Sequence, residues 1–241
     1  MEKASLLLLP GTLCNQRLWA HQMQHLSDIA DVKVPDLTRD DSIEDMARTV
    51  LREAPDRFAL AGLSMGGIVS LEIMRQAPER VTALALLDSN PLPAKQEQKK
   101  TWDGFIAMAR EGRFLEITEK HLLPTLIRQE SINNEKLVST IIKMAKEVGK
   151  EAMIRQMTAL KSRPDAREVL GTISCPTLVM LGRQDVVCPL HLHELLAENI
   201  PDAHLVIVEE SGHLSSLEQP QAVTAVFRYW LQRSEPSSWE T

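Results

Sequence analysis

At Ala59-Leu60-Ala61-Gly62-Leu63-Ser64-Met65-Gly66-Gly67, an aliphatic run turns abruptly into a helical pattern. The stretch has the spacing G-x-S-x-G, with Ser64 between two glycines. A strand that passes at once into a helix forces the residue at the turn into strained backbone geometry, and the flanking glycines let the backbones approach closely. The serine hydroxyl would then project from the carboxyl end of a sheet, beside the positive end of a helix dipole. The pattern predicts a nucleophilic Ser64, or else a glycine-rich turn that only caps a helix.

Short aliphatic runs alternate with helical patterns on both sides of this stretch. The runs are continuous in Leu, Val, Ile and Ala, which is typical of strands covered on both faces. Helical patterns begin near Ser42, Met65, Leu192 and Pro220. This alternation predicts a parallel sheet with right-handed crossovers. The predicted strands are Ser5–Leu9, Asp31–Val34, Phe58–Leu63, Val81–Asp88, Pro176–Leu181 and Ala203–Val208.

Residues 91–165 differ from the rest of the chain in charge and in pattern. They hold 14 Lys and Arg and 10 Asp and Glu, a net charge of +4, whereas the remainder holds 13 basic and 23 acidic residues, a net charge of −10. They contain no strand-like run, but apolar residues recur on helical faces. We therefore predict a helical cap, residues 94–163, inserted between the fourth and fifth strands of a core formed by residues 1–93 and 164–241. The apolar faces comprise Trp102, Phe105, Ile106 and Ala109; Leu137, Ile141, Met144 and Val148; and Met153, Met157 and Leu160.

A serine hydroxyl is a weak nucleophile until a base takes its proton. His213 follows the last predicted strand in Glu209-Glu210-Ser211-Gly212-His213, where Gly212 gives the loop conformational freedom. The other six histidines lie in helical patterns, in the insertion or at the start of a strand. His191 and His193 would point to different faces of a helix and are not expected to bind a metal. His213 is therefore the candidate base.

The base in turn needs a carboxylate that holds its tautomer and stabilises the imidazolium. Asp185 follows the fifth predicted strand in Gly182-Arg183-Gln184-Asp185 and is the candidate acid. Asp88, at the end of the fourth strand, remains an alternative acid, or a polar residue that ends the strand.

Negative charge that develops on a substrate carbonyl oxygen needs two N–H donors. The Met65 amide, directly after the nucleophile, is one candidate. The other should come from the loop after the first strand, where Gly11 lets the backbone bend. The amide of Thr12 is the first choice there, and that of Leu13 is the second.

Composition excludes several other classes of function. A chain with a formal charge of −6 and few aromatic residues has no broad basic surface, so no nucleic-acid partner is expected. Purely aliphatic runs such as Leu6–Leu9 are far shorter than a membrane span of ~20 residues and too short for a signal-peptide core. The three cysteines, Cys14, Cys175 and Cys188, have no spacing typical of a disulfide framework or a zinc site. We expect a reduced, cytoplasmic protein that uses no metal and no cofactor.

Taken together, these segments resemble the α/β-hydrolase superfamily over almost the whole chain, in the triad order Ser64, Asp185, His213. The resemblance implies an α/β-hydrolase fold with helices on both faces of the sheet, and oxyanion amides at Thr12 and Met65. Within the superfamily, the chain is most similar to small capped carboxylesterases, including the pimeloyl carrier-protein methyl ester esterases, whose helical cap lies where residues 94–165 lie here. The matching segments are Leu8–Thr12 with Trp19, Gly62–Gly67, Ile173–Thr177 leading to Gly182-x-x-Asp185, and Ser211–His213.

Two features depart from many members of that superfamily. The oxyanion loop has Pro10-Gly11 where many relatives have His-Gly, so the hydrogen bonds around this loop must differ. Only Met1–Ala4 precede the first strand, where many relatives begin with an antiparallel hairpin. We therefore expect six parallel strands in the order 2-1-3-4-5-6. Ligands bind such a sheet where the strand order reverses, and Thr12 and Ser64 both lie there.

The resemblance implies a serine hydrolase that cleaves a small-molecule or acyl-chain ester through an acyl-enzyme. A carbon–carbon hydrolase, a lyase or an enol-lactone hydrolase with the same triad is the alternative, and would need an arginine for a substrate carboxylate, with Arg110, Arg128 and Arg155 as candidates. A dehalogenase is excluded because the nucleophile position holds a serine. A ligand-binding module would usually have a broken triad. The basic cap predicts either solvated helices or a docking surface for an acidic carrier protein.

Overall fold

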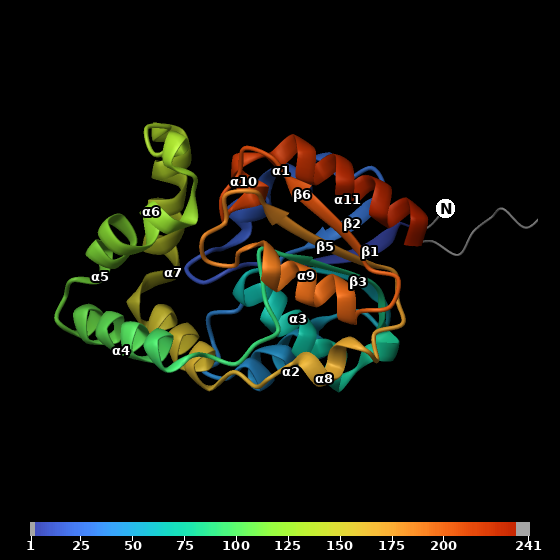
Figure 1. Cartoon of the computed structure of the whole chain (residues 1–241), viewed down its shortest axis with the longest axis horizontal. Coiled ribbons are helices and arrows are strands. Elements are labelled where there is room, and N and C mark those ends of the chain that lie inside the picture. The colour runs from blue at the N-terminus through green and yellow to red at the C-terminus, as the bar shows by residue number, and fades with distance from the viewer. Residues whose placement is uncertain (1–2, 235–241) are drawn as a thin grey trace, which may run out of the picture.

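Six parallel strands form one sheet in the order β2-β1-β3-β4-β5-β6, in a computed structural model that describes residues 3–234 (Figure 1). The predicted strand order is confirmed, and every strand begins and ends within one residue of its predicted position. The order reverses between β1 and β3, so the carboxyl ends of these strands flank the usual ligand site of such sheets. The strands are β1 (Ala4–Leu9), β2 (Ala30–Lys33), β3 (Phe58–Leu63), β4 (Val81–Leu87), β5 (Thr177–Gly182) and β6 (His204–Val208).

Helices cover both faces of this sheet, as predicted. Successive strand residues point to opposite faces, so Leu6 and Leu8 pack on one side while Leu7 and Leu9 pack on the other. Both sides are buried, which explains why the strands are continuous apolar runs. The side of Leu7 is covered by α2 (Ile43–Glu53), α3 (Met65–Gln76), α8 (Arg167–Leu170) and α9 (Leu190–Asn199), and the opposite side by α1 (Ala20–His25) and α11 (Pro220–Ser234) (Figure 1).

The ends of these helices follow local sequence signals. Ser42 Oγ accepts a hydrogen bond of 3.1 Å from the Asp45 amide and so caps α2. Helix α3 ends at Gln76, shortly before Pro78. No helix within residues 3–234 combines the length and the apolar character needed to cross a membrane. Shorter helical segments occupy Gln16–Trp19, Pro78–Arg80, Ile117–Leu122, Gln129–Ser131 and α10 (Ser215–Glu218).

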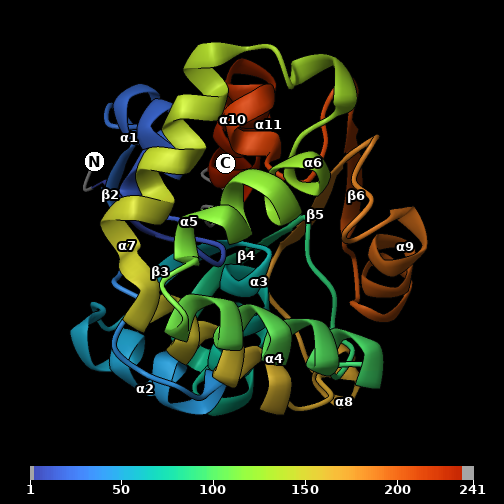
Figure 2. The ribbon, with the colours of Figure 1, turned by 90° about the vertical axis from the view of Figure 1, so that its left-hand side faces the viewer.

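A helical insertion between β4 and β5 lies over one end of the sheet (Figures 1 and 2), which confirms the predicted place of the cap. Its longest helix changes direction at Gly149, which has a φ of 82°. The exact division of the chain at residues 94 and 163 stays a prediction. The helices of the insertion are α4 (Gln96–Arg110), α5 (Phe114–Glu116), α6 (Leu123–Leu126) and α7 (Glu135–Ser162).

Two backbone contacts without intervening side chains place α3 against the sheet. A Cβ atom on Gly66 would lie 2.2 Å from the Leu9 carbonyl oxygen, and one on Gly62 would lie 2.3 Å from the Gly66 carbonyl oxygen. Only glycine permits such approaches. The loop that follows β1 is thereby held beside the β3–α3 turn, where a Cβ atom on Gly11 would lie 3.4 Å from Ser64 Cβ.

Candidate active site

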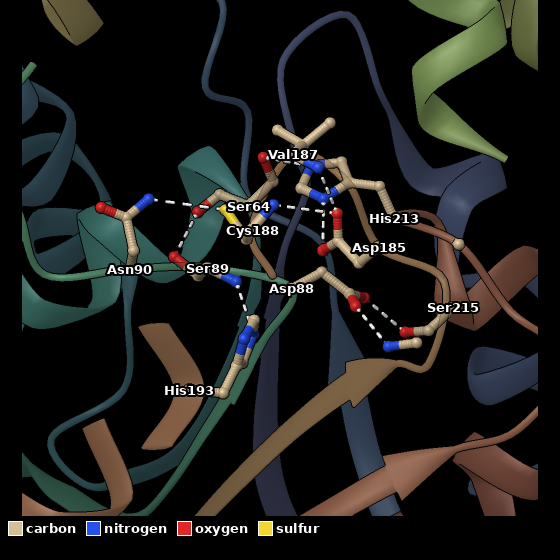
Figure 3. A network of polar contacts seen from close by, with 12 residues as sticks. Ser64, Asp88, Ser89, Asn90, Asp185, Val187, Cys188, His193, His213 and Ser215 are labelled. Atoms are coloured by element: carbon tan, nitrogen blue, oxygen red, sulfur yellow. Dashed lines mark hydrogen bonds and ion pairs between the residues drawn. The ribbon is translucent and has the colours of Figure 1, made fainter. Parts of the chain in front are cut away.

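Ser64 occupies the turn between β3 and α3 in a strained backbone conformation (Figure 3). Its φ of 57° and ψ of −116° are rare for a residue with a side chain, and strain of this kind persists only where the surrounding structure imposes it. The Ser64 amide donates a hydrogen bond of 2.9 Å to the Leu87 carbonyl of the neighbouring strand. The residue is half-buried and directly follows the carboxyl end of β3.

His213, in the loop after β6, reaches the Ser64 hydroxyl, and Asp185, in the loop after β5, reaches His213. His213 Nε2 lies 2.8 Å from Ser64 Oγ, and Nδ1 lies 2.8 Å from Asp185 Oδ2. The other carboxylate oxygen of Asp185 accepts hydrogen bonds from the amides of Val187 (2.8 Å) and Cys188 (2.9 Å). With a proton on Nδ1, the imidazole donates to Asp185 and can accept the serine proton at Nε2. The structure thus brings the three predicted residues into one hydrogen-bonded chain.

The charges of this pair stabilise each other inside the protein. Burial opposes protonation of His213, but the adjacent Asp185 carboxylate outweighs it and raises the pKa of His213 above its ordinary value of 6.5. Burial likewise opposes ionisation of Asp185, yet the imidazolium charge and the hydrogen bonds to the carboxylate lower its pKa. Asp185 is therefore ionised at neutral pH and favours the imidazolium form of His213.

The amides predicted to bind an oxyanion differ in whether they already donate a hydrogen bond within the protein. The Leu13 amide donates a hydrogen bond of 3.0 Å to Gln156 Oε1, so it is already engaged. The amides of Thr12 and Met65 make no hydrogen bond to any other residue in the range 3–234. Thr12 lies in a turn closed by a hydrogen bond of 3.1 Å from the Cys14 amide to the Gly11 carbonyl. The geometry favours Thr12 over Leu13 as the second donor beside Met65.

Asp88, the alternative acid, lies behind the triad and makes no hydrogen bond to His213. Its carboxyl accepts a hydrogen bond of 2.8 Å from the Gly182 amide and contacts Ser215 Oγ at 2.5 Å (Figure 3). Complete burial, followed by the nearby charge of Asp185, raises the pKa of Asp88 to about 8. Gly182 precedes the loop of Asp185 and Ser215 follows His213, so Asp88 ties together the loops that carry Asp185 and His213.

A second polar network supports the Ser64 turn from the opposite side. Ser89 Oγ donates a hydrogen bond of 2.8 Å to the Ser64 carbonyl, and the Ser89 amide donates one of 3.1 Å to His193 Nε2. Burial lowers the pKa of His193 to about 4, which keeps its ring neutral and able to accept. His191 is exposed, so the two histidines do not face a common ligand.

One group of residues in the described part of the chain has metal-binding chemistry, namely Asp185, Cys188 and His213, whose ligand atoms lie within 4.8 Å of one another. Two of these residues are already hydrogen-bonded to each other. Burial raises the pKa of the Cys188 thiol, so the sulfur does not offer a thiolate. The group fits a proton-transfer pair better than a metal site.

Sequence reasoning missed two residues that support the site. Gln156 is buried in α7 and contacts the Thr12 turn through the Leu13 amide. The signal was present, because its position shares a helical face with an apolar stripe, where a buried amide needs polar partners. That stripe consists of Met153, Met157 and Leu160.

Glu218 is the other missed residue. Its carboxylate accepts hydrogen bonds from the amides of Gly212 (2.6 Å) and Arg128 (3.2 Å), which link the loop of His213 to the cap. A glutamate at the end of a short helix gave no such signal in the sequence.

Comparisons with known proteins agree with this architecture. The model of a family described as the alpha/beta hydrolase family matches residues 6–226. A pimeloyl-[acyl-carrier protein] methyl ester esterase from Hamiltonella defensa subsp. Acyrthosiphon pisum is 24% identical over 96% of this chain and 94% of its own length.

Two solved structures are also similar. A thermophilic esterase from Thermogutta terrifontis, studied with malate bound, superposes with a TM-score of 0.88 and 26% identity, over 96% of this chain and 90% of that chain. The enol-lactonase from Burkholderia xenovorans LB400 superposes with a TM-score of 0.87 over 96% and 92% of the two chains. Its identity is 22%, so this likeness concerns the fold alone.

We predict that Asp88→Asn keeps ester turnover within about threefold of the wild type. The asparagine Oδ1 can accept from the Gly182 amide and its Nδ2 can donate to Ser215, so both loops stay tied. Asp88→Ala leaves two buried groups unpaired and should lower the free energy of unfolding, at about 1–3 kcal/mol for each group. Urea unfolding and turnover of an aryl ester measure the two effects.

The pH dependence of the free energy of unfolding distinguishes a protonated Asp88 that bridges the two loops from an Asp88 that only fills space. Between the ordinary carboxyl value of 3.8 and about 8, folded Asp88 holds a proton that the unfolded chain has lost. The wild type should therefore lose stability relative to Asp88→Asn as pH rises through this window. A stability difference that is constant with pH would show that Asp88 is ionised in the folded protein.

Proposed function

The chain belongs to the alpha/beta hydrolase family, and on that premise we propose that it cleaves a carboxylic ester through a serine acyl-enzyme. The observation that carries the proposal is the hydrogen-bonded chain from Ser64 Oγ through His213 to Asp185. Each member follows a strand at the carboxyl edge of the sheet, and Ser64 is half-buried whereas Asp185 and His213 are buried.

In this proposal His213 takes the Ser64 proton as the hydroxyl oxygen attacks the ester carbonyl carbon. The tetrahedral oxyanion accepts hydrogen bonds from the Thr12 and Met65 amides, and Asp185 stabilises the imidazolium. The imidazolium then protonates the leaving alcohol oxygen as the ester bond breaks. Water, deprotonated by His213, attacks the acyl-enzyme, and the collapse of the second tetrahedral intermediate returns the proton to Ser64.

A carbon–carbon hydrolase or lyase would need an arginine that binds a substrate carboxylate. Two of the three candidate arginines donate hydrogen bonds within the protein. Arg155 Nε donates a hydrogen bond of 2.8 Å to the Thr38 carbonyl, and Arg128 Nε donates one of 3.2 Å to Ser131 Oγ. Arg110 is exposed at the end of α4. A panel of aryl esters of increasing acyl length, run beside lactone and amide substrates, tests the substrate class.

We expect Ser64→Ala to remove ester turnover and fluorophosphonate labelling while circular dichroism and Tm stay near the wild-type values. Loss of the nucleophile of a serine triad costs on the order of 10⁶ in rate, because only the oxyanion donors and substrate binding remain. A folded variant that kept more than about a hundredth of the wild-type activity would exclude Ser64 as the nucleophile.

We expect kcat/KM for a neutral ester to rise with pH to a plateau, with its midpoint above 6.5. The base must be neutral to accept the Ser64 proton, and Asp185 raises the pKa of His213, which moves the ascending limb to higher pH. The imidazole of Asp185→Asn, followed by NMR titration, should have a lower pKa than in the wild type. A midpoint below 6.5, or a profile that is flat from pH 5 to 8, would contradict a histidine base paired with Asp185.

A more specific proposal concerns the substrate. We propose that it is an ester of an acyl chain on an acidic carrier protein, and that this protein docks on the cap. Lys143, Lys146 and Lys150 are exposed on α7, and the similar esterase from Hamiltonella defensa carries an acyl-carrier substrate in its name. Complementary charge mainly raises the association rate, and salt screens it over a Debye length of ~10 Å at 0.1 M. We therefore expect kcat/KM for a carrier-bound ester to fall steeply with salt, while that of a small neutral ester does not.

A charge-matched pair of variants tests where the carrier docks. Replacing Lys143, Lys146 and Lys150 with Gln should weaken turnover of the carrier-bound ester alone. Replacing Lys33, Arg48 and Arg57 with Gln removes the same charge outside the cap and should change little. Equal effects from both triple variants, or equal salt dependence for both substrates, would leave the cap lysines as a solvated surface.

A further inference from the structure

The apolar core of the cap contains one residue from outside the insertion. This residue is Leu13, which is 4% exposed and lies next to the proposed oxyanion donor Thr12. Its backbone φ of 58° is unfavourable for a leucine, so its packing must hold it there. The buried cap residues that pack with it are Ile106, Ala109, Ile117, Ala145, Met153 and Met157.

Gln156 holds the same residue through its backbone. The side chain is 1% exposed, and its Oε1 accepts the hydrogen bond of 3.0 Å from the Leu13 amide. Its Nε2 donates a hydrogen bond of 3.1 Å to the Leu37 carbonyl in the loop after β2. One amide from α7 therefore joins two loops at the carboxyl end of the sheet.

The Leu37 carbonyl decides which way this amide points. If the amide of Gln156 turned over, its oxygen would face the Leu37 carbonyl oxygen and both would be buried without a donor. Nε2 must therefore face Leu37, which leaves Oε1 to face Leu13. Such an oxygen accepts an N–H but repels a carbonyl.

This arrangement selects one conformation of the turn Gly11–Cys14. A rotation of the Thr12–Leu13 peptide would return Leu13 to the negative φ that a leucine prefers at the third position of a turn. The same rotation would turn the Thr12 carbonyl oxygen toward Gln156 Oε1 and would change the backbone ψ of Thr12, the residue whose amide is the proposed oxyanion donor. Gln156 thus stabilises the strained form of the turn against its relaxed alternative.

We propose that Gln156 is a positioning residue for the oxyanion hole, which holds the turn of Thr12 in its catalytic conformation through the Leu13 amide. The cap then supports the chemical step in addition to covering the site. This inference rests on the proposed ester hydrolysis, because it assigns a supporting residue to that reaction.

The test is Gln156→Met, which has a similar volume and makes neither hydrogen bond. Removal of one oxyanion donor costs roughly 10²–10³ in kcat, so a displaced donor should cost about 10- to 100-fold. KM for a neutral aryl ester should change by less than about threefold. The Ki of an aryl trifluoromethyl ketone, whose hemiketal places an oxyanion in the hole, should weaken in parallel with kcat.

Glu147→Gln is the matched control, since Glu147 also joins α7 to the segment after β1. Its carboxylate accepts hydrogen bonds of 2.9 Å from Asn15 Nδ2 and from Arg17 Nε, but it does not touch Leu13. This ion pair is exposed, and its loss should leave kcat within about twofold. A loss in Glu147→Gln as large as in Gln156→Met would show that general cap docking, rather than the Leu13 contact, is responsible.

Gln156→Glu provides a second measurement that does not depend on Gln156→Met folding well. A protonated glutamate can accept from Leu13 and donate to Leu37, whereas its carboxylate cannot donate. The ratio of its kcat to that of the wild type should therefore fall as pH rises.

The results separate the two proposals. A wild type inert to esters and to fluorophosphonate would refute the hydrolase. An active wild type with unchanged kcat and Ki in Gln156→Met, or with a Gln156→Glu ratio that stays the same between pH values at which the introduced carboxyl is protonated and ionised, would refute the positioning role alone.

Discussion

The contact between the Gly66 backbone and the end of β1 is the constraint on which the rest of the site depends. With no side chain between them, the first turn of α3 lies against the Leu9 carbonyl, and the loop that follows β1 must pass beside Ser64. A second contact of this kind joins the ends of β5 and β6, where a Cβ atom on Gly182 would lie 2.1 Å from the Gly212 carbonyl oxygen. One contact aligns Ser64 with the amides of Thr12 and Met65, and the other aligns Asp185 with His213.

Two carboxyl groups behind the imidazole are held in different ionisation states by their surroundings. Asp185 accepts two amide hydrogen bonds and faces His213, so it is stabilised as an anion. Asp88 is completely buried near that anion, so it is favoured in its neutral form, with a pKa of about 8. Interacting acids commonly divide their protonation states in this way. The neutral carboxyl can then bridge two loops without adding a second charge beside the imidazole.

Much of this could be predicted from the sequence because strand periodicity and chain order are local signals. Continuous apolar runs located all six strands, and Ser64, Asp185 and His213 could be selected because each follows a strand whose end lies at the same edge. Asp88 was more ambiguous, since it also follows a strand, and only its partners Gly182 and Ser215 distinguish a bridge between loops from a partner of the base.

The sequence ranked Thr12 ahead of Leu13, but the contact that engages the Leu13 amide could not be predicted from it, for a related reason. It depends on Gln156, which lies 143 residues away from Leu13. Helical periodicity indicates that position 156 faces inward, but it does not indicate which backbone groups the amide meets. The change of direction at Gly149, which sets how the second half of α7 descends to this loop, is likewise absent from a periodic pattern.

That separation of 143 residues also affects the order in which the protein folds and the way it opens locally. Contacts between distant segments form late in folding, because a long loop must close before they contribute. The sheet can therefore be complete while the turn at Thr12 is still free to rotate. Local opening of the cap would release the same turn without disturbing the strands. Hydrogen exchange at the Leu13 amide requires such an opening, so this one backbone proton reports the fraction of time for which the folded chain is without its cap contact.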